Sequence, residues 1–226
     1  MTTMAAPLVF LVDDDASVRK SLARLVKTAG YEAELFASVR DFLARAPYDG
    51  PCCLVLDVRM PGLTGLDLQE ALRVAGQHLA IVFITGHRDV PVSVKAMKAG
   101  AVDFLTKPFR EQDLLDAVTI ALEQDRARRA EELKNATLRD SFDSLSARER
   151  DVVAWVAAGA LNKQIAAELG LSEVTVKVHR AKAMRKLHAK SMAELVRMIE
   201  ALRIHRLASV QLPSGGPFSC LKARAS

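Results

Sequence analysis

The chain has 226 residues, of which 50% are hydrophobic and 26% charged, which excludes an intrinsically disordered protein and favours two small globular domains. No apolar run reaches the roughly 18 residues of a membrane span, and three acids at residues 13–15 stand where a signal peptide needs its cleavage region, so we expect a cytoplasmic protein without a membrane partner. The formal net charge is −4 over residues 1–125 and +9 over residues 126–226, so the second half suits a phosphate-rich partner such as nucleic acid.

Short apolar runs typical of strands alternate with helical patterns through the first half of the chain. Each run is followed by a segment with apolar residues at helical spacing. The five strand runs are LVFLV (8–12), YEAELF (31–36), CCLVLD (52–57), AIVFIT (80–85) and AVDFLT (101–106). Five consecutive strand–helix repeats predict an α/β domain over residues 1–122, with a parallel five-stranded sheet covered by helices on both faces.

Two adjacent cysteines, Cys52 and Cys53, open the third strand run, and Cys220 lies near the C-terminus. Three cysteines in this arrangement give neither an even disulfide framework nor a metal-ligand spacing. We expect the adjacent pair to act as small hydrophobic residues of a buried strand rather than as a redox-active pair.

The remainder of the chain changes character after the fifth repeat. Residues 123–143 are rich in charge and in good helix formers and contain no Pro or Gly, which predicts a helical linker. A coiled coil is the alternative, but the apolar positions are too sparse for sustained heptads. Residues 144–207 show only short helical patterns separated by glycines, which predicts a separate all-α domain of four helices. Residues 208–226 are rich in Ser, Gly and Pro and are predicted to form a disordered tail.

Chemically active side chains follow four of the five predicted strands. Asp13 and Asp14 come after the first strand, Asp57 ends the third, Thr85 ends the fourth and Lys107 follows the fifth. The carboxyl ends of parallel strands meet at one edge of a sheet, so we expect these side chains to lie together. Clustered carboxylates need a cation, and their hard oxygen atoms suit Mg²⁺. With Mg²⁺ and an ammonium group drawing charge from a phosphoryl group, one carboxylate can attack phosphorus and form an aspartyl phosphate.

The motifs around these residues are VDDD, LDVRMPGLTGLDL, FITGH and FLTKPF, and through them residues 7–122 resemble the receiver domain of two-component response regulators. The resemblance implies a flavodoxin-like (βα)5 fold, a sensor histidine kinase as partner and Asp57 as the phosphorylated residue. It implies that Asp14, Asp57 and the backbone carbonyl of Arg59 bind Mg²⁺, with Asp13 assisting through water. A receiver takes part in its own phosphorylation and dephosphorylation and is otherwise not an enzyme.

The same resemblance assigns roles to residues around the phosphoryl group. Thr85 and Lys107 would contact that group. Phe104 would be the switch aromatic that changes rotamer when Thr85 moves, although it also fits a plain core position of the fifth strand. Arg59 and His87 occupy the two positions that influence the rate of dephosphorylation in this family.

A phosphatase is an alternative for the acidic motif. The run Asp13-Asp14-Asp15 after an apolar strand is similar to the DxD nucleophile motif of haloacid-dehalogenase phosphatases. Ser17, however, occupies a position that usually holds Thr or Val, and no acidic metal pair follows Lys107 at a strand end. That alternative also leaves the MPG sequence after residue 57 unexplained, so we favour the receiver.

The C-terminal domain has the pattern of a helix-turn-helix: a short helix, a glycine turn and a longer basic helix over about residues 173–187. This longer basic helix carries apolar residues at helical spacing, some of which we expect to face the core: Val174, Val178, Ala181, Met184 and Leu187. Its Lys and Arg residues suit a DNA major groove, although an ordinary helical bundle with a solvated basic face would show the same pattern.

Residues 145–199 resemble the LuxR/FixJ/NarL output domain through the motifs LSxREx, NKxIA, TVKVH and KSxxEL. The resemblance implies that promoter DNA is bound. The implied base readers are Lys177, Val178, Arg180 and Ala181, of which Ala181 stands where some relatives carry Lys. The implied phosphate contacts, which position the domain without reading sequence, are Lys163, Thr175, Lys182 and Lys186.

The final helix has an apolar stripe that suits either the domain core or a partner helix. The stripe comprises Met192, Leu195, Val196, Ile199 and Leu202. In this family the helix pairs two protomers, and such a dimer would read two half-sites about one helical turn apart.

These observations together predict a phosphorylation-controlled transcriptional regulator similar to the StyR/TodT-like subgroup. Phosphorylation of Asp57 would rearrange Thr85 and Phe104, promote a homodimer and raise DNA affinity through avidity. RNA polymerase would be a further partner, and activation is the more common outcome in the family. In the alternative, the receiver is only a protein-interaction module and DNA binding is constitutive.

Overall fold

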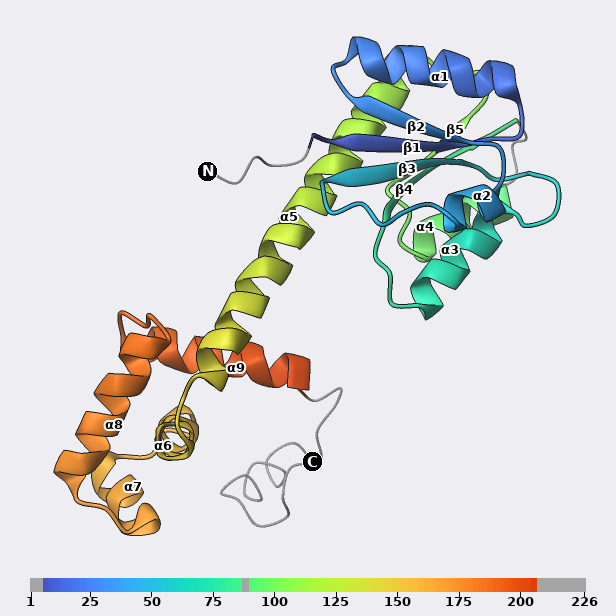
Figure 1. Ribbon diagram of the computed structural model, residues 1–226. Coiled ribbons are helices and arrows are strands. Elements are labelled where there is room, and N and C mark those ends of the chain that lie inside the picture. The colour runs from blue at the N-terminus through green and yellow to red at the C-terminus, as the bar shows by residue number, and fades with distance from the viewer. Residues whose placement is uncertain (1–5, 87–89, 207–226) are drawn as a thin grey trace. The chain divides into compact units, whose positions relative to one another are not determined.

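The computed structural model describes residues 6–86 and 90–206, with side chains up to residue 202. The chain divides into two compact units, residues 1–130 and 131–226, which are described separately below (Figure 1). The predicted tail, residues 208–226, and the candidate residue His87 lie outside the described residues, as does Cys220.

The first unit contains a parallel five-stranded sheet with the strand order β2-β1-β3-β4-β5. Its strands are β1 (Leu8–Val12), β2 (Glu32–Phe36), β3 (Cys52–Asp57), β4 (Ala80–Thr85) and β5 (Asp103–Thr106). The prediction of a parallel α/β sheet is therefore confirmed. Every residue of β3 is buried, which explains why this central strand reads as a continuous apolar run.

Helices cover both faces of the sheet (Figure 1). The helices of this unit are α1 (Ala16–Thr28), α2 (Val39–Leu43), α3 (Gly65–Val74), α4 (Val90–Lys98) and the beginning of α5 (Glu111–Asp143). Buried residues of α2, α3 and α4 pack in one core, and those of α1 and α5 pack in another on the opposite face. Cys52 belongs to the first core and Cys53 to the second, as expected of small hydrophobic residues in a buried strand.

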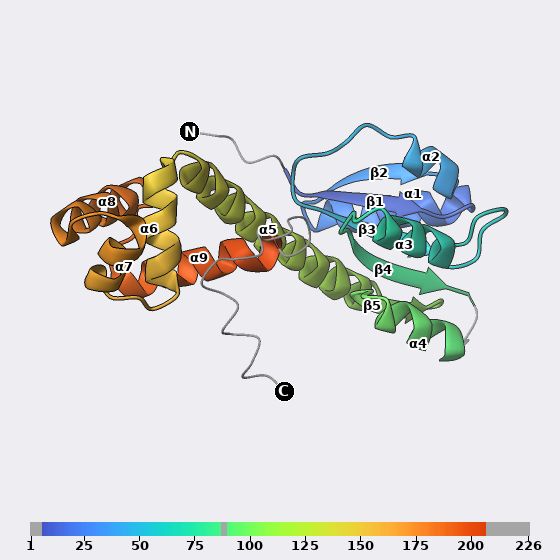
Figure 2. The same ribbon diagram turned by 90° about the horizontal axis from the view of Figure 1, so that it is seen from below.

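Helix α5 is continuous over 33 residues (Figure 2). Its first half buries Leu114, Ala117, Val118, Ala121, Leu122 and Asp125. Between residues 126 and 144 no residue is buried within the chain. Near the end of the helix, Leu138 and Phe142 pack against the core of the second unit.

One buried carboxylate fixes α5 to the beginning of β3. Asp125 is 1% exposed, and its Oδ2 accepts hydrogen bonds from the backbone N–H of Cys52 at 2.9 Å and from Nε of Arg129 at 2.6 Å. Arg128 donates to its other oxygen, and Arg129 also donates to the carbonyl of Asp49. Burial alone would raise the pKa of Asp125, but these hydrogen bonds hold it below its ordinary value.

The second unit is entirely helical in the part that the structure describes. Its helices are α6 (Ala147–Ala157), α7 (Asn162–Leu169), α8 (Glu173–Lys186) and α9 (Met192–Arg206). Helix α6 begins with a capping box between Ser146 and Glu149, and Ser172 caps α8. Gly170 ends α7 with a φ of 63°, a left-handed conformation that glycine adopts without strain. The predicted four-helix domain is confirmed.

Candidate functional site

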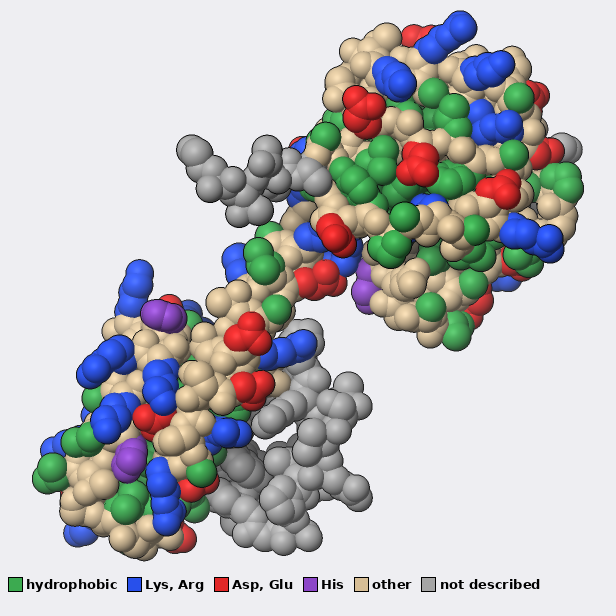
Figure 3. Space-filling view, in the orientation of Figure 1, with side chains coloured by type: hydrophobic (Ala, Val, Ile, Leu, Met, Phe, Trp, Pro, Cys, Tyr) green, Lys and Arg blue, Asp and Glu red, His purple; other side chains and the backbone are tan. Residues whose placement is uncertain are grey.

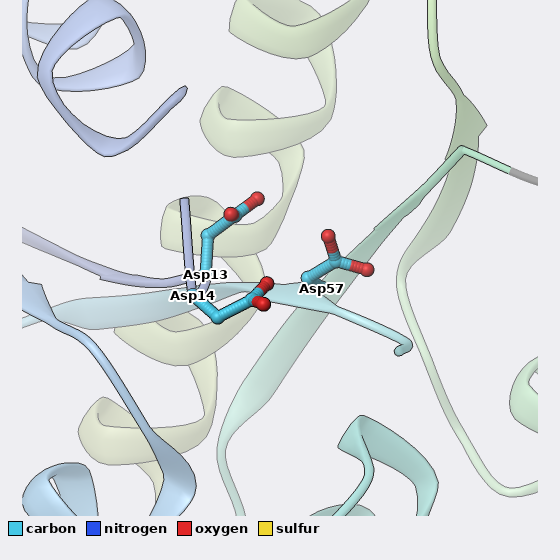
Figure 4. A group of neighbouring side chains, drawn as sticks. All are labelled: Asp13, Asp14 and Asp57. Carbon is cyan, nitrogen blue, oxygen red and sulfur yellow. The ribbon is translucent and has the colours of Figure 1, made fainter. Parts of the chain in front are cut away.

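The carboxyl edge of the sheet brings the predicted acidic residues together. Asp13 and Asp14 follow β1, and Asp57 ends the adjacent strand β3 (Figure 4). One ligand oxygen of each carboxylate lies within 4.8 Å of those of the other two. The register pairs Asp57 with Ile84, which places Thr85 at the same edge one residue further along β4.

Lys107 links two of these carboxylates directly. Its Nζ donates to Oδ2 of Asp13 at 2.7 Å and to Oδ2 of Asp57 at 2.8 Å. Its backbone N–H donates to the carbonyl of Thr85 at 2.7 Å, which fixes the loop after β5 beside β4, and the following Lys107–Pro108 peptide bond is cis. The backbone N–H of Arg59 donates to the second oxygen of Asp57 at 3.0 Å. Asp57 is therefore oriented by an ammonium group and a main-chain donor.

The electrostatics of this edge favour the binding of a cation. Asp13 is 1% exposed and Asp57 is 7% exposed. Burial raises the pKa of Asp57, although the hydrogen bonds from Lys107 and Arg59 oppose that rise. Burial by itself would lower the pKa of Lys107, but hydrogen bonds to Asp13 and Asp57 raise it, so Lys107 is a cation at neutral pH. One ammonium thus faces three carboxylates, and the excess negative charge on hard oxygen atoms fits a divalent ion such as Mg²⁺.

Gly65, the first residue of α3, packs directly against the end of β3. A Cβ atom at this position would lie 2.5 Å from the carbonyl oxygen of Asp57 and 3.0 Å from side-chain atoms of Leu56 and Phe83. The Gly65 N–H also donates to the carbonyl of Val58 at 3.0 Å. The start of α3 therefore determines where the Asp57 backbone lies, a role that the sequence analysis did not assign.

Two further residues with predicted roles lie in or beside the site. Thr85 is 2% exposed at the end of β4. The Phe104 ring lies 6.2 Å from that of Phe83 and packs against the core as a half-buried side chain. The geometry of Phe104 suits a core residue, and its role as a switch stays a prediction. Arg59, predicted to tune dephosphorylation, is exposed.

Helix α8 buries only part of its apolar series. Its buried side chains are Val176 and Ala183, Met184 is partly buried, and Leu187 is buried directly after the helix. Val174 is 69% exposed and Val178 is 45% exposed, so these two belong to the part of the apolar series that does not face the core. Ala181 is exposed as well. The helix buries the face on the opposite side because contacts with α6 and α7, rather than its own apolar periodicity, set its rotation.

The basic side chains of the second unit divide into exposed and paired groups. Lys163, Lys177 and Lys182 are exposed, and Figure 3 shows Lys and Arg side chains gathered over α8. Lys186 is different, because its Nζ donates to Oε2 of Glu149 at 2.7 Å and to the Ser144 carbonyl at 3.1 Å. Lys186 is thus a partner of the 4% exposed Glu149, although its own side chain is 41% exposed, and its role as a phosphate contact stays a prediction.

Two other predicted DNA contacts also have partners within the domain. The Arg180 guanidinium donates to Oδ1 of Asn162 at 3.1 Å, and Arg180 is only half-exposed. The hydroxyl of Thr175 shares a hydrogen bond of 2.8 Å with that of Ser172, the residue that caps α8. Arg180 is on the side of α8 that faces α7, so its geometry fits a positioning residue better than a base reader.

The apolar stripe of α9 belongs largely to the core of its own domain. Leu195 is 0% exposed and Ile199 is 4% exposed, and Met192 and Leu202 pack partly buried against the same core. Of the two possibilities left open by the sequence, the structure shows the core for Leu195 and Ile199, and the role of this helix in a dimer stays a prediction. Val196 is half-buried and is not among the side chains of that core. Among the described helices, none combines the length and hydropathy that a membrane span requires.

A receiver-type sheet with an acidic pocket, joined to a helical domain with an exposed basic helix, defines the class of DNA-binding response regulators. Residues 9–119 match the response regulator receiver domain, and residues 143–199 match the family described as bacterial regulatory proteins, luxR family. The chain belongs to the two-component response regulators with a LuxR-type DNA-binding domain.

Relatives of known name support this membership. The chain is 52% identical over 197 residues to Nodulation protein W of Bradyrhizobium diazoefficiens, covering 87% of each chain. It is 46% identical to the response regulator protein TodT of Pseudomonas putida, covering 88% of this chain and 87% of TodT. The solved structure of the response regulator StyR superposes with a TM-score of 0.77 at 48% identity, covering 87% of this chain and 99% of StyR.

Proposed function

We propose that the chain accepts a phosphoryl group on Asp57 and that this modification controls DNA binding by its second unit. The observation that carries the proposal is the arrangement of Asp57, whose two oxygen atoms are held by the Lys107 ammonium and the Arg59 N–H beside two more carboxylates. A carboxylate held in this way lies beside an ammonium group whose positive charge can stabilise a phosphoryl group during transfer.

The transfer is an in-line substitution at phosphorus. An oxygen of Asp57 forms a bond to phosphorus while the bond from phosphorus to the donor breaks, and the leaving group departs with that electron pair. The donor is the phosphohistidine of a sensor kinase or a small acyl phosphate. Lys107 gives up its hydrogen bond to Asp57 and donates to a phosphoryl oxygen, and the Thr85 hydroxyl donates to another. Asp14, Asp57 and the Arg59 carbonyl, with Asp13 in support, would hold a Mg²⁺ ion, which would supply further positive charge for the phosphoryl group.

In this proposal the protein is cytoplasmic, and the second unit binds promoter DNA as part of a dimer. Lys177, Val178 and Ala181 lie on the exposed face of α8 and are the proposed base readers. Lys163 and Lys182 are exposed and are the proposed phosphate contacts. A homodimer that forms on phosphorylation would engage two half-sites, recruit RNA polymerase and activate transcription, with Val196 as the available α9 contact.

Asp57→Asn is the variant that tests this proposal. Full-length protein is incubated with acetyl phosphate and Mg²⁺, and phosphorylation, oligomeric state and DNA affinity at fixed salt are measured in the same samples. We expect wild type to be phosphorylated, to dimerise and to bind DNA 10²- to 10⁴-fold more tightly, because two linked sites then act together, roughly as for other bivalent binders. Asp57→Asn should show none of these changes, and the exposed control Asp116→Asn should respond like wild type.

Two results would contradict the proposal in different ways. A phosphoryl group found on Asp13, with rapid turnover, would indicate a phosphatase. Equal and tight DNA binding by wild type and Asp57→Asn, with or without acetyl phosphate, would indicate a constitutive DNA-binding protein.

Removal of one carboxylate tests the proposed metal site. Asp14 is exposed and contributes an oxygen to the acidic cluster, so Asp14→Asn should preserve the fold and weaken Mg²⁺ binding. Mg²⁺ at about 100 times its dissociation constant should stabilise wild type by about 2.7 kcal/mol, because only the folded state binds it. Thermal unfolding with Mg²⁺ or with EDTA measures this difference. An equal stabilisation of Asp14→Asn would show that Asp14 is not a ligand.

A further inference from the structure

Two exposed valines interrupt the basic face of α8. Val174 and Val178 are 69% and 45% exposed, and neither belongs to the core of the helical domain. Exposing large β-branched side chains in water gains nothing for folding, and valine has a low helix propensity. The domain already has its own core side chains on the opposite side of the helix. The two valines are therefore not part of the core in the described part of the domain.

Their place on the helix coincides with the exposed lysines. At about 100° per residue, Val174, Val178 and Ala181 fall within roughly 60° of one another. Lys177 and Lys182 flank this apolar strip on either side. Figure 3 shows hydrophobic side chains beside Lys and Arg side chains near the beginning of α8. A narrow apolar strip between cations is unsuited to a protein core or to a lipid tail. It suits the DNA major groove, where base edges lie between two negatively charged phosphate backbones.

We infer that Val174, together with Val178, reads the C5 methyl groups of thymines in the major groove, and this inference rests on the proposed DNA-binding role of α8. The thymine methyl is the one apolar group that a base pair presents in that groove, and apolar side chains recognise it by contact. Val174 is the second residue of α8, and recognition helices contact base edges with their N-terminal residues.

The spacing of the two valines determines how far apart the contacted thymines can lie. Side chains at i and i+4 of a helix are roughly 5–6 Å apart, whereas successive bases of one strand are about 3.4 Å apart along the duplex axis. Val174 and Val178 can therefore contact thymines one or two steps apart. Val174 is thus a further specificity-determining residue, four residues before the proposed reader Val178.

Replacing thymine by uracil tests the inference, because the two bases differ only in the C5 methyl. Full-length protein treated with acetyl phosphate and Mg²⁺ first selects its site from a random duplex library. Each thymine of a half-site is then replaced in turn by uracil, and the dissociation constants are measured. We expect at least one replacement to weaken wild-type binding by about fourfold, the effect of burying one methyl group. Val174→Ala should bind that thymine duplex and its uracil counterpart with equal affinity.

Two comparisons make the test specific. Lys163→Ala should weaken binding to both duplexes equally and keep the fourfold preference, because a phosphate contact does not read sequence. Val178→Ala should lose the preference at a different thymine. Equal binding of all thymine and uracil duplexes by wild type would overturn the inference, as would Val174→Ala retaining every preference. Failure of wild type to bind any selected duplex would instead overturn the DNA-binding role itself.

Discussion

Asp125→Ala is expected to destabilise the receiver unit by about 3 kcal/mol. Removing one partner of a buried ion pair costs about 3–5 kcal/mol when the other partner stays buried, and the two arginines here are partly exposed, which favours the lower value. The substitution also leaves the Cys52 N–H without its acceptor at the start of the central strand. Both arginines then lose the carboxylate that pairs with them, and Arg129 loses the group that helps to hold it against the loop before β3.

The chain contains its own probes for this measurement. Its two tyrosines, Tyr31 and Tyr48, lie in the first unit and its single tryptophan, Trp155, in the second. In Asp125→Ala, the midpoint of urea unfolding measured by the near-ultraviolet signal of the tyrosines should shift to a lower urea concentration. The midpoint measured by Trp155 fluorescence should not change. Asp116→Ala on the exposed face of the same helix is the matched control and should change stability by less than about 0.5 kcal/mol.

The effect of Asp125 should also depend on pH. Its pKa is lowered in the folded state, so its contribution is present above the unfolded value of 3.8 and is lost as the pH falls through the folded value. The difference in stability between wild type and Asp125→Ala should therefore shrink in acid. A difference that persists unchanged at low pH would mean that the side chain stabilises the unit by packing rather than by its charge.

Gly65→Ala should cost about 1–3 kcal/mol and slow phosphorylation of Asp57. The new Cβ would lie 2.5 Å from a main-chain oxygen that cannot rotate away, so either α3 or the end of β3 must move. The higher helix propensity of alanine, worth up to about 1 kcal/mol, offsets only part of this cost. Because the displaced oxygen belongs to Asp57 itself, the nucleophile moves with it, and small displacements of reacting groups slow a reaction markedly.

Gly86→Ala is the control for this substitution. A Cβ at Gly86 would meet nothing within 4 Å, and the backbone there does not adopt the left-handed conformation. We expect unchanged stability for this variant by the same urea titration. The initial rate of phosphorylation by acetyl phosphate then compares the two variants. An alanine at Gly65 that leaves both stability and rate unaltered would refute the close packing described above.

The regular features of the fold were predictable from sequence because they depend on pattern. The strand runs 8–12, 52–57 and 80–85 coincide with β1, β3 and β4, since buried parallel strands must be continuously apolar. The acidic edge was predictable for a related reason: topology alone brings Asp13 and Asp57 to adjacent strand ends. Continuous apolar runs for the strands and a period of 3.6 residues for the helices carry this information within the sequence itself.

The unpredicted features depend on contacts between elements. The partners of Asp125 at i+3 and i+4 were visible as a spacing, but its bond to Cys52, 73 residues away, was not. The rotation of α8 was not predictable because Val174 and Val176 are equally apolar, and only the neighbouring helices decide which of them is buried. The ion pair of Lys186 with Glu149 joins residues 37 apart in the sequence and has no local signal.

The pairing of Lys186 with Glu149 separates the formal charge of the second half from the charge that DNA can use. A lysine already paired with a carboxylate, as Lys186 is with Glu149, should displace fewer counterions on a DNA phosphate than an exposed lysine that has no such partner. We therefore expect the salt dependence of DNA binding to be smaller than the sum of all basic residues implies. A small electrostatic footprint of this kind leaves sequence-dependent contacts a larger share of the total affinity.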